Sequence, residues 1–380
     1  MEKIPLSKPF ITGKEEEYLR AVVSSGQLAS DGPFTHRCSR LLEERFGIHR
    51  VLMTPSCTSS LEMAIMLCDL EPGDEVIMPS FTFVSSANAV VRAGGRPVFV
   101  DIRSDTLNLD ETLVSRAVTS KTKAIMPVHY AGVGCEMDSI MSIAEDRRLI
   151  VIEDAAQGVN AFYRGRVLGS IGHIGGYSFH DTKNYTCGEG GAICINSPEL
   201  VERAEIIREK GTNRSKFFRG EVDKYSWVDV GSSFIPSEIS CAFLCAQLEA
   251  MEAITERRRQ IFDRYLEAFS RLEEAGIVQM PSIPEGCQSN YHIFYLLVRD
   301  RQTRDELMAA LKRWGIQAVF HYVPLHTSQM GQKLGYEAGD LPLTENLSER
   351  LLRLPLFNDI SESEQARVID GVTRVLTGEL

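Results

Sequence analysis

The chain has 380 residues, 43% of them hydrophobic and 24% charged, which is enough for a large core and more than one domain usually holds. Its formal net charge of −11 argues against a broad nucleic-acid-binding surface but leaves room for a local basic pocket. No run approaches the roughly 20 apolar residues of a membrane-spanning helix, and residues 1–10 have no apolar signal core, so we expect a cytoplasmic protein without a membrane partner.

The first fifty residues predict two helices, and a regular alternation of elements follows them. Apolar positions recur at helical spacing over Lys14–Ser24 and Thr35–Phe46, and a link rich in glycine and serine joins the two segments. Short β-rich runs then alternate with helical segments. The runs are Arg50–Met53, Glu75–Met78, Arg96–Val100, Ala124–Val128 and Ile150–Ile152. This alternation predicts an α/β fold with a mainly parallel sheet and helices on both faces.

The C-terminal third predicts a second, smaller domain. A long helical pattern runs from Ser237 to about Arg271, and we expect a large domain over residues 1–240 and a small α+β domain over residues 241–380. The later elements expected are strands at His292–Val298 and Ala318–Tyr322 and helices at Thr303–Trp314 and Ser361–Leu376. The nine cysteines form no CxxC pair and no zinc-finger spacing, so we expect mostly buried, reduced thiols and no metal site.

Polar residues that directly follow apolar runs are the first candidates for a site, because ligands collect at the carboxyl ends of parallel strands. Ser56, Cys57 and Thr58 form such a turn before an apolar helix. Free backbone amides and the positive end of the helix dipole suit a phosphate there. The alternative is ordinary N-capping of the helix by Ser56 or Thr58.

Two further places supply an acid and an amine. Asp154 and Gln157 follow an apolar run, and a carboxylate buried at a strand end needs a partner such as a protonated pyridine nitrogen. Solvation of the strand end or helix capping is the alternative. Lys183 stands between the aromatic run Tyr177–His180 and the glycine-rich run Gly188–Gly191, where desolvation would lower its pKa and free the amine for imine chemistry. Most lysines, however, are solvated surface residues.

A fourth place lies in the predicted small domain, where His321, Tyr322 and His326 follow a β-rich run. Each histidine alone is more often structural, although side chains near a domain junction could reach a cleft. The order of the first three places is the stronger signal, since an anion-binding turn, an acidic strand end and a lysine are the groups that pyridoxal phosphate requires. The sequence therefore predicts a pyridoxal-phosphate site that contains Lys183 and Asp154.

From Pro9 to about Asn358 the chain resembles the DegT/DnrJ/EryC/StrS sugar aminotransferases, whose fold is of the aspartate-aminotransferase type (fold type I). Long contiguous runs carry the resemblance: Leu52–Thr58, Gly73–Ser85, Pro127–Val133, Glu153–Val159, Ser178–Thr186 and Arg208–Gly220. Within the family these runs are most similar to those of the enzymes that make dTDP-4-amino-4,6-dideoxygalactose. The resemblance implies an aspartate-aminotransferase-like fold and pyridoxal phosphate as the cofactor.

The resemblance also implies roles for individual residues. Lys183 would form the covalent imine link to the cofactor and, once displaced, shuttle the proton. Asp154 would hold the proton of the ring nitrogen, Gln157 would contact the side of the phenolic oxygen, and Phe81 would stack on the ring. The phosphate would be bound through backbone or hydroxyl donors by Ser56, Cys57, Thr58 and Ser178.

Two segments depart from the family pattern. Ser233 stands where many members carry an asparagine that reaches the partner's phosphate, and we expect it to take over that contact. The loop Thr186–Gly191 is one residue shorter than in the most similar enzymes, which would alter the rim of the cleft. Because the family closes each site with residues of a neighbouring subunit, the resemblance implies a homodimer with sites at the subunit interface.

The implied reaction is a ping-pong transfer of an amino group from L-glutamate to C4 of dTDP-4-keto-6-deoxy-D-glucose, giving dTDP-4-amino-4,6-dideoxy-D-galactose. His180 is the third residue that we place in catalysis, three positions before the lysine. The side chains expected to bind sugar or donor are Tyr185, Lys216, Arg219, Tyr322 and His326. The alternatives are another nucleotide keto-sugar (3-keto, or linked to UDP or GDP), dehydration of a keto-sugar, and a regulator that binds the cofactor without turnover. Dehydratases of this fold carry histidine in place of the lysine, which argues against dehydration.

Overall fold

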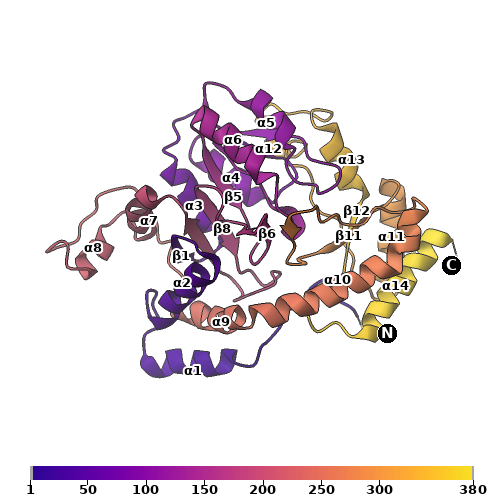
Figure 1. Ribbon diagram of the computed structural model, residues 1–380, viewed down its shortest axis with the longest axis horizontal. Helices are drawn as coiled ribbons and strands as arrows, with labels where there is room; N and C mark the ends of the chain where they lie inside the picture. Colours follow the sequence, from indigo (N-terminus) through magenta and orange to yellow (C-terminus); the bar gives the residue numbers. More distant parts are fainter. Residues whose placement is uncertain (1–2, 379–380) are drawn as a thin grey trace.

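The computed structural model describes residues 3–378, and a seven-stranded sheet forms its centre (Figure 1). The strands lie in the order β1-β9-β8-β5-β4-β2-β3, and β9 runs in the direction opposite to that of the other six. Their bounds are β1 Arg50–Thr54, β2 Glu75–Pro79, β3 Arg96–Val100, β4 Thr122–Ile125, β5 Ile150–Asp154, β8 Ile174–Ser178 and β9 Gly191–Ile195. The expected α/β class with a mainly parallel sheet is confirmed, as are the five strands expected before residue 155, with β4 shifted toward the N-terminus.

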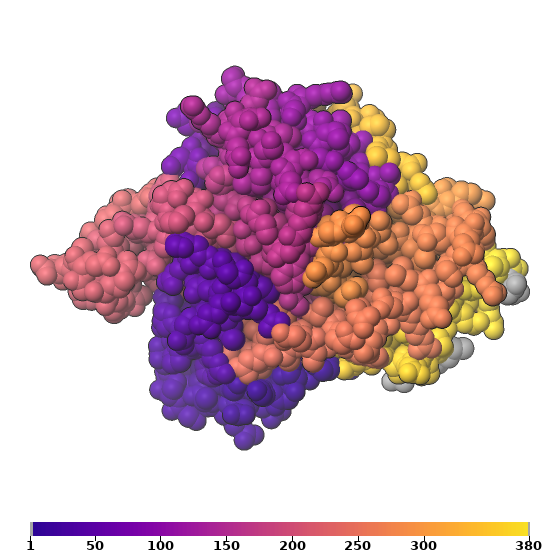
Figure 2. Space-filling view, viewed as in Figure 1, coloured from indigo at the N-terminus to yellow at the C-terminus, as the bar shows by residue number. Residues whose placement is uncertain are grey.

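Helices cover both faces of the sheet, as the sequence predicts. The helices before residue 250 are α1 Glu15–Ser25, α2 Pro33–Phe46, α3 Cys57–Leu67, α4 Val84–Arg92, α5 Glu111–Ala117, α6 Met137–Arg147, α7 Val201–Arg208, α8 Arg214–Phe218 and α9 Glu238–Glu249, with 3₁₀ turns at Tyr130–Gly132 and Pro198–Leu200. The first two confirm the helices expected in the N-terminal fifty residues. Residues 212–230, which include α8, form an arm that projects from the body of the molecule, while α7 packs against the sheet (Figures 1 and 2).

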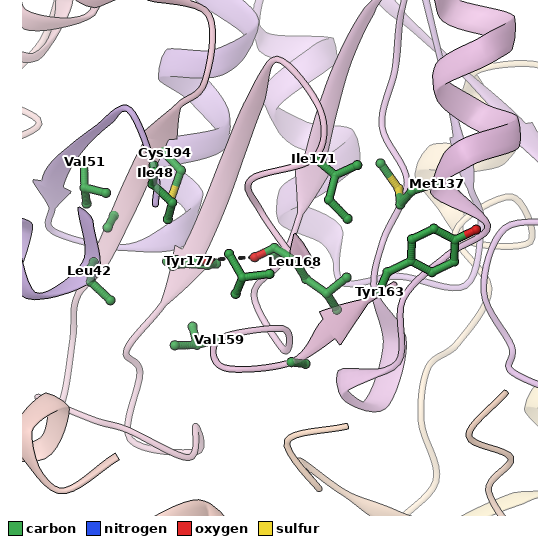
Figure 3. Close-up of a cluster of buried hydrophobic side chains, with 14 of the residues drawn as sticks. Leu42, Ile48, Val51, Met137, Val159, Tyr163, Leu168, Ile171, Tyr177 and Cys194 are labelled. Carbon is green, nitrogen blue, oxygen red and sulfur yellow. Dashed lines mark hydrogen bonds between the residues drawn. The ribbon is translucent and has the colours of Figure 1, made fainter. Parts of the chain in front are cut away.

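Successive side chains of each strand enter two different cores, one on each face of the sheet. Val51 and Met53 of β1 pack in a cluster with α2, α6 and α9, while Leu52 between them packs in a second cluster with α3, α4 and α7. Figure 3 shows part of the first cluster, where the Tyr177 hydroxyl donates a hydrogen bond to the Leu168 carbonyl at 2.6 Å. Burial of both faces explains why these strands form nearly continuous apolar runs in the sequence.

The C-terminal part is built around the antiparallel pair β11 and β12. The elements after residue 250 are α10 Met251–Glu274, β10 Cys287–Gln288, β11 Phe294–Leu297, α11 Arg301–Arg313, α12 Gln329–Lys333, α13 Pro342–Arg350, β12 Leu351–Leu354 and α14 Glu362–Thr377. A small sheet joins this part to the large one through β10, β6 (Phe162–Tyr163) and β7 (Arg166–Val167). The expected strand near residue 295 and the expected helices near residues 308 and 369 are confirmed by β11, α11 and α14.

Two expectations for the C-terminal part are wrong in detail. The helical pattern that begins near Ser237 is two helices, because the chain turns at Ala250, where φ is −95° and ψ is 12°. No strand forms over Ala318–Tyr322, where Val319 alone bridges to Arg353.

We propose that the division between the two domains lies later than the expected residue 240, because the hydrophobic clusters change only after α9. Buried side chains of α9, such as Cys241 and Leu248, pack in the core under the sheet. The core of the C-terminal part begins at Ile261 and includes Ile4 from the N-terminal segment. We therefore propose a division inside α10, with the N-terminal segment packed on the small domain.

The state of the cysteines and the length of the apolar helices can both be compared with the expectations from composition. All nine cysteines are free thiols, and all are buried except Cys187 and Cys287, which are partly exposed. None of the helices within residues 3–378 has both the length and the apolar sequence that a bilayer crossing needs.

Candidate active site

A cavity of about 660 Å³ opens at the carboxyl ends of β1, β5 and β8, between the sheet and the C-terminal part. Because these three strands run parallel, their carboxyl ends meet at one edge of the sheet. Many of the residues expected in the site line this cavity: Ser56, Cys57, Thr58, Asp154, Gln157, Ser178, His180, Lys183 and Tyr322. The anion-binding turn, the acidic strand end and the lysine therefore meet in one place.

The start of α3 offers an anion two unused amides. Ser56 caps the helix by accepting a hydrogen bond from the backbone amide of Ser59 at 3.1 Å, as the capping alternative has it. The backbone amides of Cys57 and Thr58 make no hydrogen bond within residues 3–378. The hydroxyl of Ser178, at the end of β8, is likewise without a hydrogen bond in this part of the chain. Capping and anion binding are thus compatible here, because they use different donors.

The glycine-rich run after the lysine brings β9 against this turn. Gly188 has a φ of +81°, which favours glycine. A Cβ on Gly191 would lie 2.5 Å from the backbone nitrogen of Cys57, so only glycine lets β9 begin there. The run is therefore required by close packing next to the cavity.

Asp154 ends β5 with a buried carboxylate that only neutral donors contact. The Ser86 hydroxyl donates to Oδ2 at 2.7 Å and the Ala156 amide donates to Oδ1 at 3.2 Å. Among residues 3–378 no cationic side chain forms an ion pair with it. The neighbouring Glu153 has a structural role instead, since it accepts three backbone amides of the following loop and bonds to His129 at 2.8 Å. A cationic ligand atom next to Asp154 would relieve the cost of its buried charge.

Lys183 lies in the loop that joins the antiparallel strands β8 and β9. Its amine faces the cavity and has no hydrogen bond or ion pair within the described residues. Burial lowers the pKa of Lys183 below its usual 10.5; the neighbouring Cys57 and Asp154 oppose this shift, and the positive charge of Arg353 lowers the pKa further. A larger fraction of the amine is therefore neutral and nucleophilic near neutral pH.

Of the two phenylalanines in this turn, Phe83 lines the cavity and the expected Phe81 does not. Phe81 is 1% exposed, and its ring packs at 5.0 Å from the ring of Tyr130 in the core. Phe83 is 58% exposed and lines the cavity, with its ring 6.4 Å from that of Tyr322. Gln157 has partners for both ends of its amide, because Oε1 accepts a backbone amide at 2.8 Å and Nε2 donates to the Tyr322 hydroxyl at 3.0 Å.

His180 lies at the exposed rim of the cavity, where its Nδ1 is 2.9 Å from the Thr182 hydroxyl. Two other expected residues have partners in the core. The Tyr185 hydroxyl bonds to Thr255, and His326 bonds to Ser80 at 2.7 Å and to Glu345 at 3.0 Å. Neither Tyr185 nor His326 lines the cavity.

Three expected residues belong to the projecting arm or its base and lie outside the cavity of their own chain. Lys216 pairs with Glu202 at 2.6 Å, and Arg219 pairs with Glu205 at 2.7 Å. Ser233, at the base of the arm, is exposed and forms an isolated bridge with Glu209.

The C-terminal part adds His292 and Arg353, which the sequence did not single out, and His321, which it named as a candidate without a role. His292 bonds to Asn184 at 2.8 Å, and burial holds its pKa well below 6.5. His321 bonds to the Tyr130 hydroxyl at 3.0 Å, and burial lowers its pKa to about 2. Both imidazoles are therefore neutral. The available sequence signal for Arg353 is that it interrupts a leucine-rich run.

Known proteins are similar to this chain over its whole length. The profile of the DegT/DnrJ/EryC1/StrS aminotransferase family matches residues 9–373. The spore coat polysaccharide biosynthesis protein SpsC of Bacillus subtilis is 32% identical over 99% of this chain and 97% of its own length. The aminotransferase TlmJ of Streptoalloteichus hindustanus has a TM-score of 0.92 at 30% identity, with 100% of both chains covered. Spr1654 of Streptococcus pneumoniae, solved in a PLP form, has a TM-score of 0.91 at 27% identity, again over 100% of both chains. The chain belongs to the DegT/DnrJ/EryC1/StrS aminotransferase family.

Proposed function

We propose that this chain transfers an amino group from L-glutamate to C4 of dTDP-4-keto-6-deoxy-D-glucose, giving dTDP-4-amino-4,6-dideoxy-D-galactose. Its family makes it a pyridoxal-phosphate-dependent sugar aminotransferase. The observation that carries the chemistry is the meeting of Lys183, Asp154 and the start of α3 in one cavity. The choice of sugar rests on the long runs that resemble enzymes with this product, such as Gly73–Ser85 and Arg208–Gly220.

The residues around the cavity fit pyridoxal phosphate. The unused amides of Cys57 and Thr58, with the Ser178 hydroxyl, would bind its phosphate. Asp154 would hold the proton on its ring nitrogen, and Lys183 would hold its aldehyde carbon. When bound, pyridoxal phosphate supplies an aldehyde that joins covalently to amines and a cationic ring that accepts electron density from the reacting carbon.

Lys183 and Asp154 divide the chemical work. Once the donor's amine has displaced it, Nζ of Lys183 takes the proton from the carbon that bears the amino group and later returns it, as general base and then general acid. The lowered pKa of Lys183 makes the neutral amine available for this step. The Asp154 carboxylate is fixed by two hydrogen bonds, so it holds its proton partner without reorganising. His180 at the rim and Tyr322 in the wall would contact the sugar.

We also propose a homodimer in which the arm of one subunit closes the site of the other. Lys216, Arg219 and Ser233 lie outside the cavity of their own chain, and Lys216 and Arg219 have the charge that a diphosphate needs. Phe218 and Trp227 on the same arm are 69% and 78% exposed. Large apolar side chains gathered on a projecting segment favour contact with another protein surface.

A panel of sugars tests the proposed substrate. The protein, pyridoxal phosphate and L-glutamate would be incubated with 4-keto and 3-keto sugars linked to dTDP, UDP or GDP, and the configuration at C4 of the product read by NMR. A dTDP-linked product with the galacto configuration supports the proposal. Amination of 3-keto sugars alone would overturn the choice of carbon, and failure of the keto-sugar to regenerate the aldehyde form of the cofactor would favour a binder without turnover.

Replacing the lysine tests the assigned amine. Lys183→Ala should lose the absorption band of the covalently held cofactor and at least about 1,000-fold in turnover, with the fold retained. After borohydride reduction of the wild-type holoenzyme, peptide mass spectrometry should find the cofactor on Lys183. The control Lys216→Ala should keep this adduct. An adduct on any other lysine would contradict the assignment.

A further inference from the structure

Arg353 is a cation in the cavity wall to which neither the sequence nor the proposed chemistry gives a role. Leu352 and Leu354 on either side of it enter the core of the C-terminal part, so Arg353 points to the opposite face of β12. Its backbone is held on both edges, by Tyr295 of β11 and by the bridge to Val319. The guanidinium therefore projects into the cavity from a fixed position.

The guanidinium of Arg353 has no partner in the described part of the chain. Its Nε is buried without a hydrogen bond, and no carboxylate of residues 3–378 pairs with it. Burial lowers the pKa of Arg353, which only nearby phenol groups oppose. Two more deeply buried arginines differ, since Arg208 pairs with Asp31 at 2.9 Å and Arg258 donates to several backbone carbonyls. A buried guanidinium that is left unpaired is costly, so this position favours an anionic ligand.

The charges around Arg353 also favour an anionic ligand. Arg353 lowers the pKa of both Lys183 and His321, so it lies within electrostatic range of the reactive amine. Asp154 is the buried carboxylate in the wall, and the exposed Glu189 lies at the rim. With the cofactor bound, Asp154 would be matched by the ring nitrogen and Lys183 would no longer carry a free ammonium. Arg353 is then the positive charge of the inner wall that is left for a substrate to match.

We infer that Arg353 binds the α-carboxylate of the amino donor, an inference that rests on the proposed function. A carboxylate is planar and accepts two parallel hydrogen bonds from a guanidinium. In an amino acid it is bonded directly to the carbon from which Lys183 takes the proton. The diphosphate of a nucleotide sugar is separated from C4 by several ring bonds. A cation close to the amine therefore suits the donor's carboxylate better than the sugar's phosphates.

This role makes the two half-reactions differ in their need for Arg353. The donor half-reaction brings a carboxylate to the reacting carbon, whereas the keto-sugar half-reaction does not. In Arg353→Met holoenzyme, kcat/KM for L-glutamate should fall about 100-fold, while amination of the keto-sugar by the amino form of the cofactor should change less than about threefold. Stopped-flow absorbance measures each half-reaction separately. Arg353→Lys should restore part of the loss, and the exposed Arg299→Met is the matched control.

A change in the donor and a binding measurement complete the test. Wild-type enzyme should prefer L-glutamate strongly over its α-amide, and Arg353→Met should lose most of this preference. Calorimetry should show 2-oxoglutarate binding to wild-type holoenzyme and about 100-fold weaker binding to Arg353→Met. An unchanged preference for the carboxylate, or a loss confined to the keto-sugar half-reaction, overturns the inference. A wild-type protein that binds 2-oxoglutarate through Arg353 but transfers no amino group overturns the proposed function alone.

Discussion

Asp154 is a buried carboxylate that has no cationic partner among residues 3–378, so a ligand is needed to balance its charge. Asp154→Asn keeps the size of the side chain and can still accept the hydrogen bond from Ser86, but it cannot hold a proton on a ring nitrogen. The cofactor should remain bound through its phosphate, while the rate of each half-reaction falls about 100- to 1,000-fold. Single-turnover absorbance measures this rate. Ser86→Ala, which removes one neutral hydrogen bond, should cost less than about tenfold, and near-normal rates in Asp154→Asn would rule out the electron-sink argument.

The buried His292 links the site to acid stability. Burial lowers its pKa well below 6.5, so below pH 6.5 the unfolded chain binds a proton that the folded chain does not. As the pH falls below 6.5, this group should therefore lower the free energy of unfolding by about 1.4 kcal/mol per pH unit. His292→Gln should show a shallower decline between pH 6.5 and 5 in urea unfolding, whereas exposed His49→Gln should keep the wild-type slope. Equal slopes for both variants would contradict the assigned cause.

Residues in long distinctive runs could be predicted, and residues in irregular loops could not. Asp154 ends β5 and Lys183 follows β8 in the next loop, so their place at the sheet edge could be predicted from the topology. Phe81 and Phe83 stand in a turn without regular period, where the sequence does not show which ring faces a ligand. Arg353 looked like a break in an apolar run, because its unpaired state depends on contacts between distant segments.

The N-terminus of α2 is capped by a side chain of another helix, α9. Glu238, buried at the start of α9, accepts the backbone amides of Gly32, Phe34 and Thr35 at 2.9 to 3.1 Å and serves as the cap that α2 lacks in its own sequence. Glu238→Ala should lower the free energy of unfolding by about 3 kcal/mol, because three amides lose their acceptor. Glu238→Gln should cost about 1 kcal/mol, since one oxygen remains. Urea unfolding measures both.

The matched control for this cap is Glu256→Ala on the exposed face of α10, which should leave the unfolding midpoint unchanged. If Glu238→Ala unfolded at the same urea concentration as this control, the cap would have no role in stability.

Helices and strands with a regular spacing of apolar residues could be predicted within a few residues. The turns and unpaired segments that interrupt them could not. Strands β1 to β5 are buried on both faces and read as apolar runs. The turn at Ala250 between α9 and α10 carries neither glycine nor proline, so nothing local marks it. The segment Ala318–Tyr322 has the composition of a strand but pairs at one residue, because strand formation depends on the partner edge as well as on propensity.

At the scale of the whole molecule, the two parts contribute different groups to the cavity. The large part supplies Lys183, Asp154 and the start of α3, whereas the C-terminal part supplies His292 and Arg353. The position of the C-terminal part therefore sets the separation between the reactive amine and the cation that we assign to the donor. The N-terminal segment lines the cavity with Leu6 and Ser7 and packs on the C-terminal core, so it joins the two parts beside the site.

The proposed homodimer predicts that arm and lysine act in different subunits. Light scattering should give a mass about twice 42.4 kDa. Replacing both Phe218 and Trp227 by aspartate should weaken the dimer and lower turnover at least about tenfold, because charge on the apolar arm opposes its burial. Val23→Asp on α1, where the valine is 69% exposed, is the control for an added surface charge away from the arm.

Mixing two inactive variants separates an arm that acts across the interface from one that acts within its own chain. Lys183→Ala lacks the amine, and Arg219→Ala lacks one of the two cations that we assign to the arm. If Arg219 serves the partner's site, a mixed dimer has one site with both groups intact, and random exchange of subunits should restore roughly a quarter of wild-type activity. If Arg219 serves its own chain, every site in the mixture lacks one group and no activity returns. Activity assays after refolding the variants together would decide between these arrangements, since stability effects on either chain lower the yield without creating an intact site.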